Sequence, residues 1–127
     1  MKFLSIYTPD PKTAAGPSSR EHMAEMEKLM DESMKAGVLI STGGLLPISK
    51  GGARVRKSGG EITVIDGPFT ETKEMIAGFA VLETKSRDEV IEIARKFIKI
   101  AGDGECELRQ MMEPGEGQAQ REGQAQR

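Results

Sequence analysis

The chain has 127 residues, a formal net charge of −2, one cysteine and one histidine. This length suits a single domain with one core, and the charge excludes a strongly basic binder of nucleic acid or of an anionic membrane. A lone cysteine cannot form an internal disulfide, and the N-terminal stretch lacks a signal-like leader and a long apolar run, so a cytoplasmic protein is expected.

A strand, a helix and a second strand are predicted in the first third of the chain. Residues 2–7 are mostly apolar, aromatic or branched and are followed by prolines, which predicts a central strand that ends there. Ser18 and Glu21 have the spacing of a capping box, so a helix is expected to begin at them and to end at Gly37. Residues 38–42 predict the second strand.

The apolar side chains of this first helix recur at steps of three and four residues: Met23, Met26, Leu29, Met30 and Met34. Such a stripe is required of a helix that covers a sheet, and it also occurs in adaptable partner grooves. We assign the stripe to the core, because the first arrangement is far commoner.

A hairpin and another strand are predicted in the middle of the chain. Residues 54–56 and 61–65 flank a turn that contains glycine, a pattern typical of a β-hairpin. The later run, residues 75–83, is apolar and predicts a further strand.

The last predicted elements are a helix and a strand. Ser86 begins a second capping box, and the apolar stripe that follows runs until Gly102. Residues 105–109 alternate polar and apolar side chains, which predicts a half-buried strand with Cys106 and Leu108 pointing inward. The order is strand-helix-strand, hairpin, strand-helix-strand, and it predicts an α+β, ferredoxin-like fold with an inserted β-hairpin.

The domain is expected to cover residues 1–113. Residues 114–127 contain mainly Gly, Gln, Ala, Glu and Arg, and residues 116–121 are repeated letter for letter as 122–127. Because this composition cannot build a core, a flexible C-terminal tail is expected.

A polar loop at residues 66–74, with the sequence DGPFTETKE, separates two of the predicted strands. Pro68 has no N–H for a strand ladder, and Asp66 can accept hydrogen bonds from the backbone after it, so a fixed turn is expected. The loop resembles the signature of the DGPF branch of the YCII-related protein family. The similarity extends to residues 43–47 and 105–109, and it covers most of the chain.

The resemblance implies a small α+β domain of the dimeric α+β barrel type. The predicted fold leads to the same expectation, because two helices on one face of a sheet leave the other face to be covered. A homodimer is therefore expected, with the sheet faces rather than the first helix at the interface.

Two residues are candidates for acid–base catalysis. His22 is the one histidine, and its side chain ordinarily titrates near neutral pH. Family members commonly carry an arginine shortly before a histidine at this helix start, together with a His/Asp pair, and residues 20–22 resemble that pattern with shortened spacing. The resemblance thus implies catalytic roles for His22 and Asp66. The alternatives are a solvated histidine and an aspartate that only caps its own turn.

Three cations are candidate ligand-binding residues. Arg54 and Arg56 lie two residues apart and share one face of the predicted hairpin, where they could hold a carboxylate or a phosphate. Lys73 lies in the signature loop beside two glutamates. Charges that protect an edge strand, and a solvated charged loop, are the alternatives.

Three classes of function remain open. The first is a cofactor-free enzyme acting on a small polar or aromatic molecule, because a YCII-related member is a dehydrochlorinase of a chlorinated hydroxyquinol. The second is a non-catalytic binder of a small ligand. The third is a regulatory protein associated with an extracytoplasmic-function sigma factor, a partnership that the DGPF resemblance implies. No metal or cofactor is expected, because one histidine and one cysteine cannot build a classical zinc site and the nucleotide-binding motifs are missing.

Overall fold

The computed structural model describes residues 1–12, 20–69 and 76–115, and all statements below concern these residues. Their elements are β1 (Lys2–Pro9), α1 (Arg20–Lys35), β2 (Leu39–Gly44), β3 (Arg54–Ser58), β4 (Glu61–Ile65), β5 (Gly78–Glu83), α2 (Arg87–Ala101) and β6 (Gly104–Gln110). Most of the predicted tail, the end of the signature loop and Ser18 of the first capping box lie outside the described residues.

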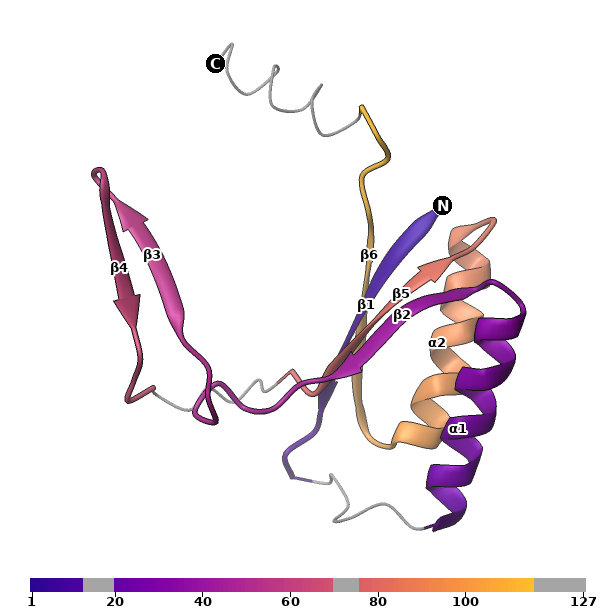
Figure 1. The fold of residues 1–127 in the computed structure, drawn as a ribbon. Coiled ribbons are helices and arrows are strands. Elements are labelled where there is room, and N and C mark those ends of the chain that lie inside the picture. Colours follow the sequence, from indigo (N-terminus) through magenta and orange to yellow (C-terminus); the bar gives the residue numbers. More distant parts are fainter. Residues whose placement is uncertain (13–19, 70–75, 116–127) are drawn as a thin grey trace.

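Four strands form an antiparallel sheet in the order β2-β5-β1-β6. Both helices cover one face of this sheet, and the β3-β4 hairpin stands on the opposite side (Figure 1). The two strand-helix-strand units are interleaved, since β5 of the second unit lies between β1 and β2 of the first. The predicted ferredoxin-like fold, the central position of β1 and the inserted hairpin are confirmed.

Strand register places the large core side chains on the helix-covered face. Phe3 of β1 is paired with Leu82 of β5, and Leu82 is in turn paired with Leu39 of β2. All three are buried, and the fully buried Val90 of α2 completes the cluster. On β6 the alternation predicted from the sequence is confirmed, because Cys106 and Leu108 are half-buried between exposed neighbours.

Local signals fix both ends of α2. The Ser86 hydroxyl accepts a hydrogen bond from the Glu89 N–H at 3.2 Å, which satisfies one of the free donors of the first turn. At the other end Gly102 has a φ of 102° and donates its N–H to the Ile98 carbonyl at 3.0 Å. The predicted boundaries of this helix are confirmed.

The assignment of the whole methionine stripe of α1 to the core is wrong in part. Met26, Leu29 and Met30 are half-buried on the sheet side, whereas Met23 and Met34 are 61% and 53% exposed. Each helical residue rotates by about 100°, so Met34 lies about 80° around the helix from Met26. This rotation carries Met34 into solvent, whereas Met23 lies two turns before Met30 and points in nearly the same direction. Met23 is exposed because it lies in the first turn, at the end of the helix.

The hairpin has a two-residue turn. Ser58 is paired with Glu61, and the intervening Gly59 and Gly60 have φ angles of 57° and 88°. Two consecutive positive φ angles are the requirement of a type I′ turn, which glycine meets without a steric penalty. The hairpin predicted from the sequence is therefore confirmed. Its turn consists of Gly59 and Gly60 alone, because Ser58 is paired with Glu61.

Neither described helix is long and apolar enough to cross a membrane.

Candidate functional site

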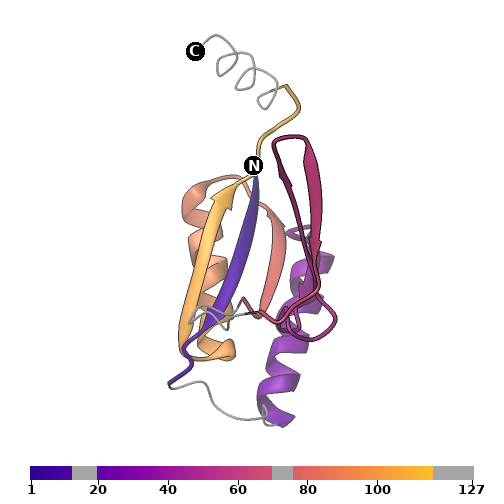
Figure 2. The ribbon, with the colours of Figure 1, turned by 90° about the vertical axis from the view of Figure 1, so that its left-hand side faces the viewer.

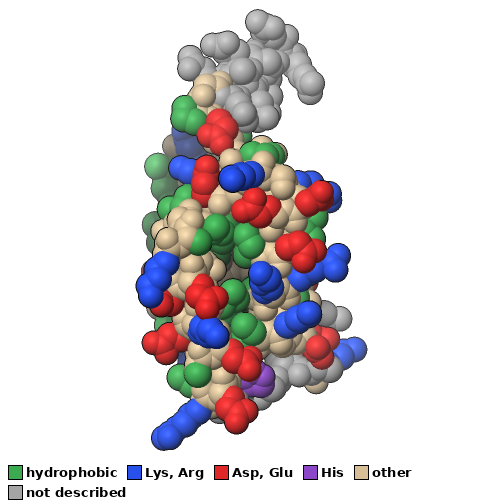
Figure 3. Space-filling model, turned by 90° about the vertical axis from the view of Figure 1, so that its right-hand side faces the viewer, with side chains coloured by type: hydrophobic (Ala, Val, Ile, Leu, Met, Phe, Trp, Pro, Cys, Tyr) green, Lys and Arg blue, Asp and Glu red, His purple; other side chains and the backbone are tan. Residues whose placement is uncertain are grey.

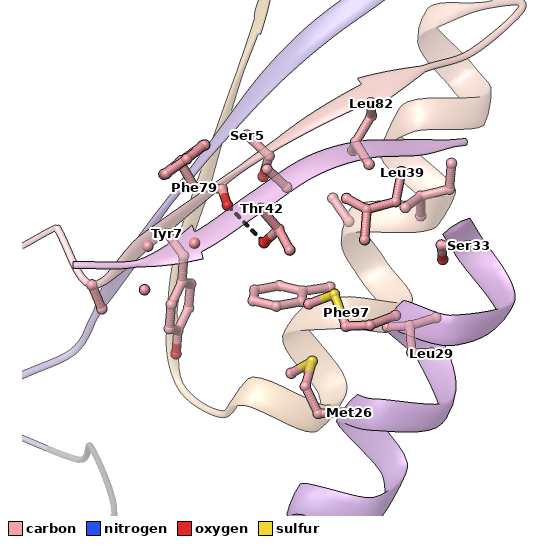
Figure 4. A pocket seen from close by; sticks show the side chains of 18 residues that line it. Ser5, Tyr7, Met26, Leu29, Ser33, Leu39, Thr42, Phe79, Leu82 and Phe97 are labelled. Atoms are coloured by element: carbon pink, nitrogen blue, oxygen red, sulfur yellow. Dashed lines mark hydrogen bonds between the residues drawn. The ribbon is translucent and has the colours of Figure 1, made fainter. Parts of the chain in front are cut away.

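A cavity of about 290 Å³ lies between the helix-covered face of the sheet and the two helices. Side chains from five elements converge on it, as Figure 4 shows. Those labelled there include Ser5, Tyr7, Met26, Leu29, Thr42 and Phe97. Thr42 and the neighbouring Gly44 are exposed, so the cavity opens to solvent along the edge strand β2.

Small residues at the ends of the strands create this space. Gly43 and Gly44 end β2, and Gly78 begins β5. Ala80 lies two residues after Gly78, on the face of β5 that points toward the helices. A Cβ atom added at Gly78 would lie 3.0 Å from the Gly43 carbonyl oxygen, so the two backbones approach each other closely at this point. Ala94 of α2 is a further small residue, on the wall opposite the strands. Because all of these residues are small, the volume that larger side chains would fill remains open.

The wall of the cavity is uncharged among the described residues, and the hydroxyl groups of Thr42 and Tyr7 on it are engaged in hydrogen bonds. Thr42 donates its hydroxyl hydrogen to the Phe79 carbonyl at 2.9 Å, and Figure 4 shows this hydrogen bond beside the cavity. The Tyr7 hydroxyl lies 3.1 Å from the Gly102 carbonyl and 3.3 Å from the Asp103 carbonyl. Both hydroxyls can therefore offer lone pairs to a ligand, while their hydrogens are held by the protein.

The Tyr7 ring is held edge-on against Phe97, with the ring centroids 5.4 Å apart and an angle of 83° between the planes. Burial raises the pKa of Tyr7 above its ordinary value, and the neighbouring Cys106 and Asp103 raise it further. Tyr7 is thus a neutral group at physiological pH, and it is unsuited to act as a base.

Burial likewise raises the pKa of the Cys106 thiol, and the hydrogen bond with the Ser5 side chain offsets part of this change. The thiol faces the helices next to Tyr7, with which it is paired across β1 and β6. A protonated, half-buried thiol has the character of a small apolar side chain, as the sequence predicted.

These two raised pKa values predict a loss of stability at alkaline pH. The folded protein keeps the Tyr7 and Cys106 protons at pH values where the unfolded chain has released them, so the unfolded state binds fewer protons. The free energy of unfolding should therefore fall as the pH rises through about 8.5, the ordinary pKa of a thiol. Urea unfolding of the wild type and of Cys106→Ser at pH 7 and pH 10 measures this loss.

The serine variant keeps a hydroxyl that can bond to Ser5 but does not titrate. It should lose less stability than the wild type between the two pH values. Equal losses in both proteins would contradict the assignment of the thiol.

The predicted catalytic residues lie apart from the cavity. His22 is exposed in the first turn of α1, and Asp66 is exposed directly after β4. Figure 1 shows the start of α1 and the end of β4 on opposite sides of the molecule. The structure does not bring these two elements together within one chain, and the proposed His22/Asp66 pair stays a prediction.

The predicted ligand-binding cations also lie away from the cavity. Arg54 and Arg56 are exposed on β3, and the carbon at the centre of the Arg54 guanidinium lies 5.3 Å from the centre of the Phe69 ring. This distance is that of a cation–π contact, which orients Arg54 along the turn after β4. Lys73 lies outside the described residues, so its role as a ligand-binding residue stays a prediction.

The sequence contained one signal for the cavity. Gly43, Gly44 and Gly78 indicate positions where backbones or a ligand approach closely, and all three line it. The side chains that form its walls carry no such signal, because Met26, Leu29 and Phe97 have the spacing of ordinary core residues. On the helix-covered side, Figure 3 shows charged side chains interspersed with hydrophobic ones.

Comparisons with known proteins confirm the YCII-related family that the sequence resembles, and the DGPF branch stays a prediction. The family model of the YCII-related domain matches residues 1–113. An uncharacterised protein of Rhizobium meliloti (strain 1021) is 37% identical over 73 residues, which are 58% of this chain and 58% of that protein. The aligned part thus spans little more than half the length of this curated relative.

Among solved structures, 5-chloro-2-hydroxyhydroquinone dehydrochlorinase from Burkholderia phenoliruptrix, in complex with 2,5-dihydroxybenzoquinone, matches with a TM-score of 0.48. The two chains are 16% identical, and the match covers 88% of this chain and 94% of the other. The family model matches residues 1–113, and this match establishes the family of the chain. The chain belongs to the YCII-related domain family.

Proposed function

We propose that the protein binds a small, neutral and mostly apolar molecule in the cavity between its sheet and its helices. The observation that carries this proposal is the uncharged wall of a cavity of about 290 Å³. An engineered apolar cavity of about 150 Å³ holds benzene, so the present volume suits a molecule of one or two rings.

The polar atoms at the cavity favour a ligand that carries a hydroxyl or amine hydrogen. Thr42 Oγ1 has given its hydrogen to the Phe79 carbonyl and can accept one from a ligand. A negatively charged ligand would lose its hydration without gaining a cation, because Arg54 and Arg56 do not line the cavity. The geometry therefore selects neutral donors over anions.

Binding is better supported than acid–base catalysis by the described wall. Tyr7 is its one ordinary titratable group among the described residues, and its raised pKa keeps it neutral. Catalysis by His22 and Asp66 together would require their side chains to meet, and within one chain they lie on elements at opposite sides of the molecule. The function that the geometry supports best is thus that of a small-ligand binder.

Titration with 2-naphthol and with 2-naphthoate tests this function. The two probes share a bicyclic ring system, but at pH 7 the first is a neutral hydroxyl donor and the second is an anion. We expect 2-naphthol to bind saturably and to shift the amide signals of β2, β5 and α2 in two-dimensional NMR spectra. 2-Naphthoate should bind at least about tenfold more weakly, because its carboxylate would be desolvated without a partner.

Two results would contradict the proposal. One is the absence of saturable shifts with 2-naphthol up to its solubility limit. The other is tighter binding of 2-naphthoate than of 2-naphthol, which would place the site at the exposed cations rather than in the cavity.

A further inference from the structure

Ser5 is a polar side chain inside the apolar core. It lies on β1, which Figure 2 shows between β5 and β6 with the helices behind the sheet. The residue is only 8% exposed, and it lines the cavity from the sheet side, as Figure 4 shows. Burying a hydroxyl group is unfavourable unless the group has a good hydrogen-bond partner. A serine is therefore an unexpected residue at this position unless something bonds to it.

The partner that the described chain gives to Ser5 is a weak one. Burial raises the pKa of the Cys106 thiol, and the hydrogen bond with Ser5 lowers it, as expected when the hydroxyl donates to the sulfur. Thr84, the other buried polar side chain among the described residues, donates instead to the carbonyl oxygen of Ser86 at 3.0 Å. Sulfur accepts hydrogen bonds more weakly than a carbonyl oxygen does. The Ser5 hydrogen can therefore turn to a better acceptor in the cavity.

The other hydroxyl groups of the cavity have a different role. Thr42 and Tyr7 give their hydrogens to backbone carbonyl oxygens, so they present only lone pairs to a ligand. Ser33 of α1 also lines the cavity, but it is half-buried, so water can bond to it. Ser5 is thus the buried donor among the described residues of the wall.

Strand register places Thr42 and Ser5 in one row across the sheet. Ala80 of β5 is paired with Thr42 of β2 on one side and with Ser5 of β1 on the other, and all three line the cavity. Neighbouring strands lie about 4.8 Å apart, so the Cα atoms of the two hydroxyl residues are about 10 Å apart. The small side chain of Ala80 leaves room between them for a flat ring with one polar group at each end.

We infer that Ser5 is a specificity-determining residue of the cavity, which takes neutral ring compounds with a hydrogen-bond donor at one end and an acceptor, such as a carbonyl oxygen, at the other. The donor end bonds to Thr42 at the exposed edge strand, and the acceptor end bonds to Ser5 on the central strand. The Ser5 hydrogen then turns from the thiol to the ligand, and the Cys106 S–H donates to the oxygen of Ser5. This inference rests on the proposed function, since it names the class of ligand that the same cavity takes.

Two neutral phenols of similar shape test the acceptor end. 4-Hydroxyacetophenone carries a carbonyl oxygen where 4-isopropylphenol carries a methyl group, and both carry the hydroxyl donor. NMR titration at pH 6, where both are neutral, gives the dissociation constant of each probe. The quantity compared between variants is the constant of 4-isopropylphenol divided by that of 4-hydroxyacetophenone. This comparison cancels the different hydrophobicity of the two probes, as in a double-mutant cycle.

Ser5→Ala should lower this ratio at least about fivefold, because the buried carbonyl oxygen of 4-hydroxyacetophenone loses its donor. Alanine preserves most of the volume of serine, so 4-isopropylphenol should bind to the variant about as tightly as to the wild type. The matched control is Ser41→Ala. Ser41 is exposed on β2 and does not line the cavity, so its substitution should leave the ratio unchanged.

The one thiol of the chain reports the position of the Ser5 hydrogen. In infrared difference spectra, its S–H stretching band should move to lower frequency when 4-hydroxyacetophenone binds, because the thiol becomes a hydrogen-bond donor. 4-Isopropylphenol should not produce this shift, and neither probe should produce it in Ser5→Ala. A serine that only fills space in the core would not couple the band to the carbonyl group of the ligand.

An equal ratio in the wild type and in Ser5→Ala overturns the inference, and so does an S–H band that does not respond to 4-hydroxyacetophenone. If 2-naphthol and 4-isopropylphenol still bind saturably, the proposed function stands and only the role of Ser5 is wrong. If no probe binds to the wild type, both are wrong. Circular dichroism shows whether Ser5→Ala is folded, and if it is not, the response of the wild-type S–H band decides.

Discussion

Replacing Ala94 with leucine should weaken the binding of 2-naphthol at least about tenfold while the fold is kept. Ala94 lies on α2 and forms part of the cavity wall, so a longer side chain there occupies the space of the ligand. Leucine is a strong helix former, and an open cavity can accept its extra carbon atoms without displacing the backbone. Calorimetric or NMR titration of the variant measures the loss directly.

The same substitution at Ala24 provides the control. Ala24 is exposed on α1 and does not line the cavity, so Ala24→Leu adds the same atoms outside the site. We expect this variant to bind 2-naphthol as the wild type does. Equal binding by the Ala94 variant would place the ligand elsewhere and would contradict the proposed function.

Replacing Leu82 with alanine should lower the free energy of unfolding by about 3 kcal/mol. Leu82 is 4% exposed and is paired with Phe3 on one side and Leu39 on the other. Its removal leaves a hole at the centre of the core and enlarges the cavity that it lines. This is a large share of the total stability of a small domain, which is about 5–15 kcal/mol.

Urea unfolding at pH 7 measures this difference, with Leu46→Ala as the matched control. Leu46 is 73% exposed, so its truncation should change the stability by less than about 0.5 kcal/mol. If both variants lost similar free energy, the central position of Leu82 in the core would be wrong. Because Leu82 faces the cavity, its variant should also bind larger apolar probes than the wild type binds.

Most of the fold could be predicted from local patterns. The capping serine at residue 86 and the glycine at 102 determine where α2 begins and ends, because they satisfy backbone groups within one turn. Gly59 and Gly60 determine the hairpin turn for a similar reason, since few other residues adopt two positive φ angles in succession. In each case the physical cause lies within a few residues of its effect.

The site depended on contacts that no local pattern specifies. The periodicity of α1 identified an apolar stripe, but only the position of the helix on the sheet decided that Met26 is half-buried and Met23 is exposed. Likewise, His22 and Asp66 were paired through a family resemblance, and the folded chain places their two elements on opposite sides. A helix period of 3.6 residues describes a face, and it does not describe what the face meets.

The sequence by itself thus determined the order of the strands and helices, the hairpin turn and the limits of α2, because these follow from hydrogen bonds and conformational preferences of adjacent residues. The tertiary structure alone decided that the end of β2, the start of β5 and the middle of α2 surround one uncharged cavity. These segments are far apart in the chain and meet only because β5 pairs between β1 and β2. A cavity is the volume that packed elements leave unfilled, so it is a property of their arrangement and of no single segment.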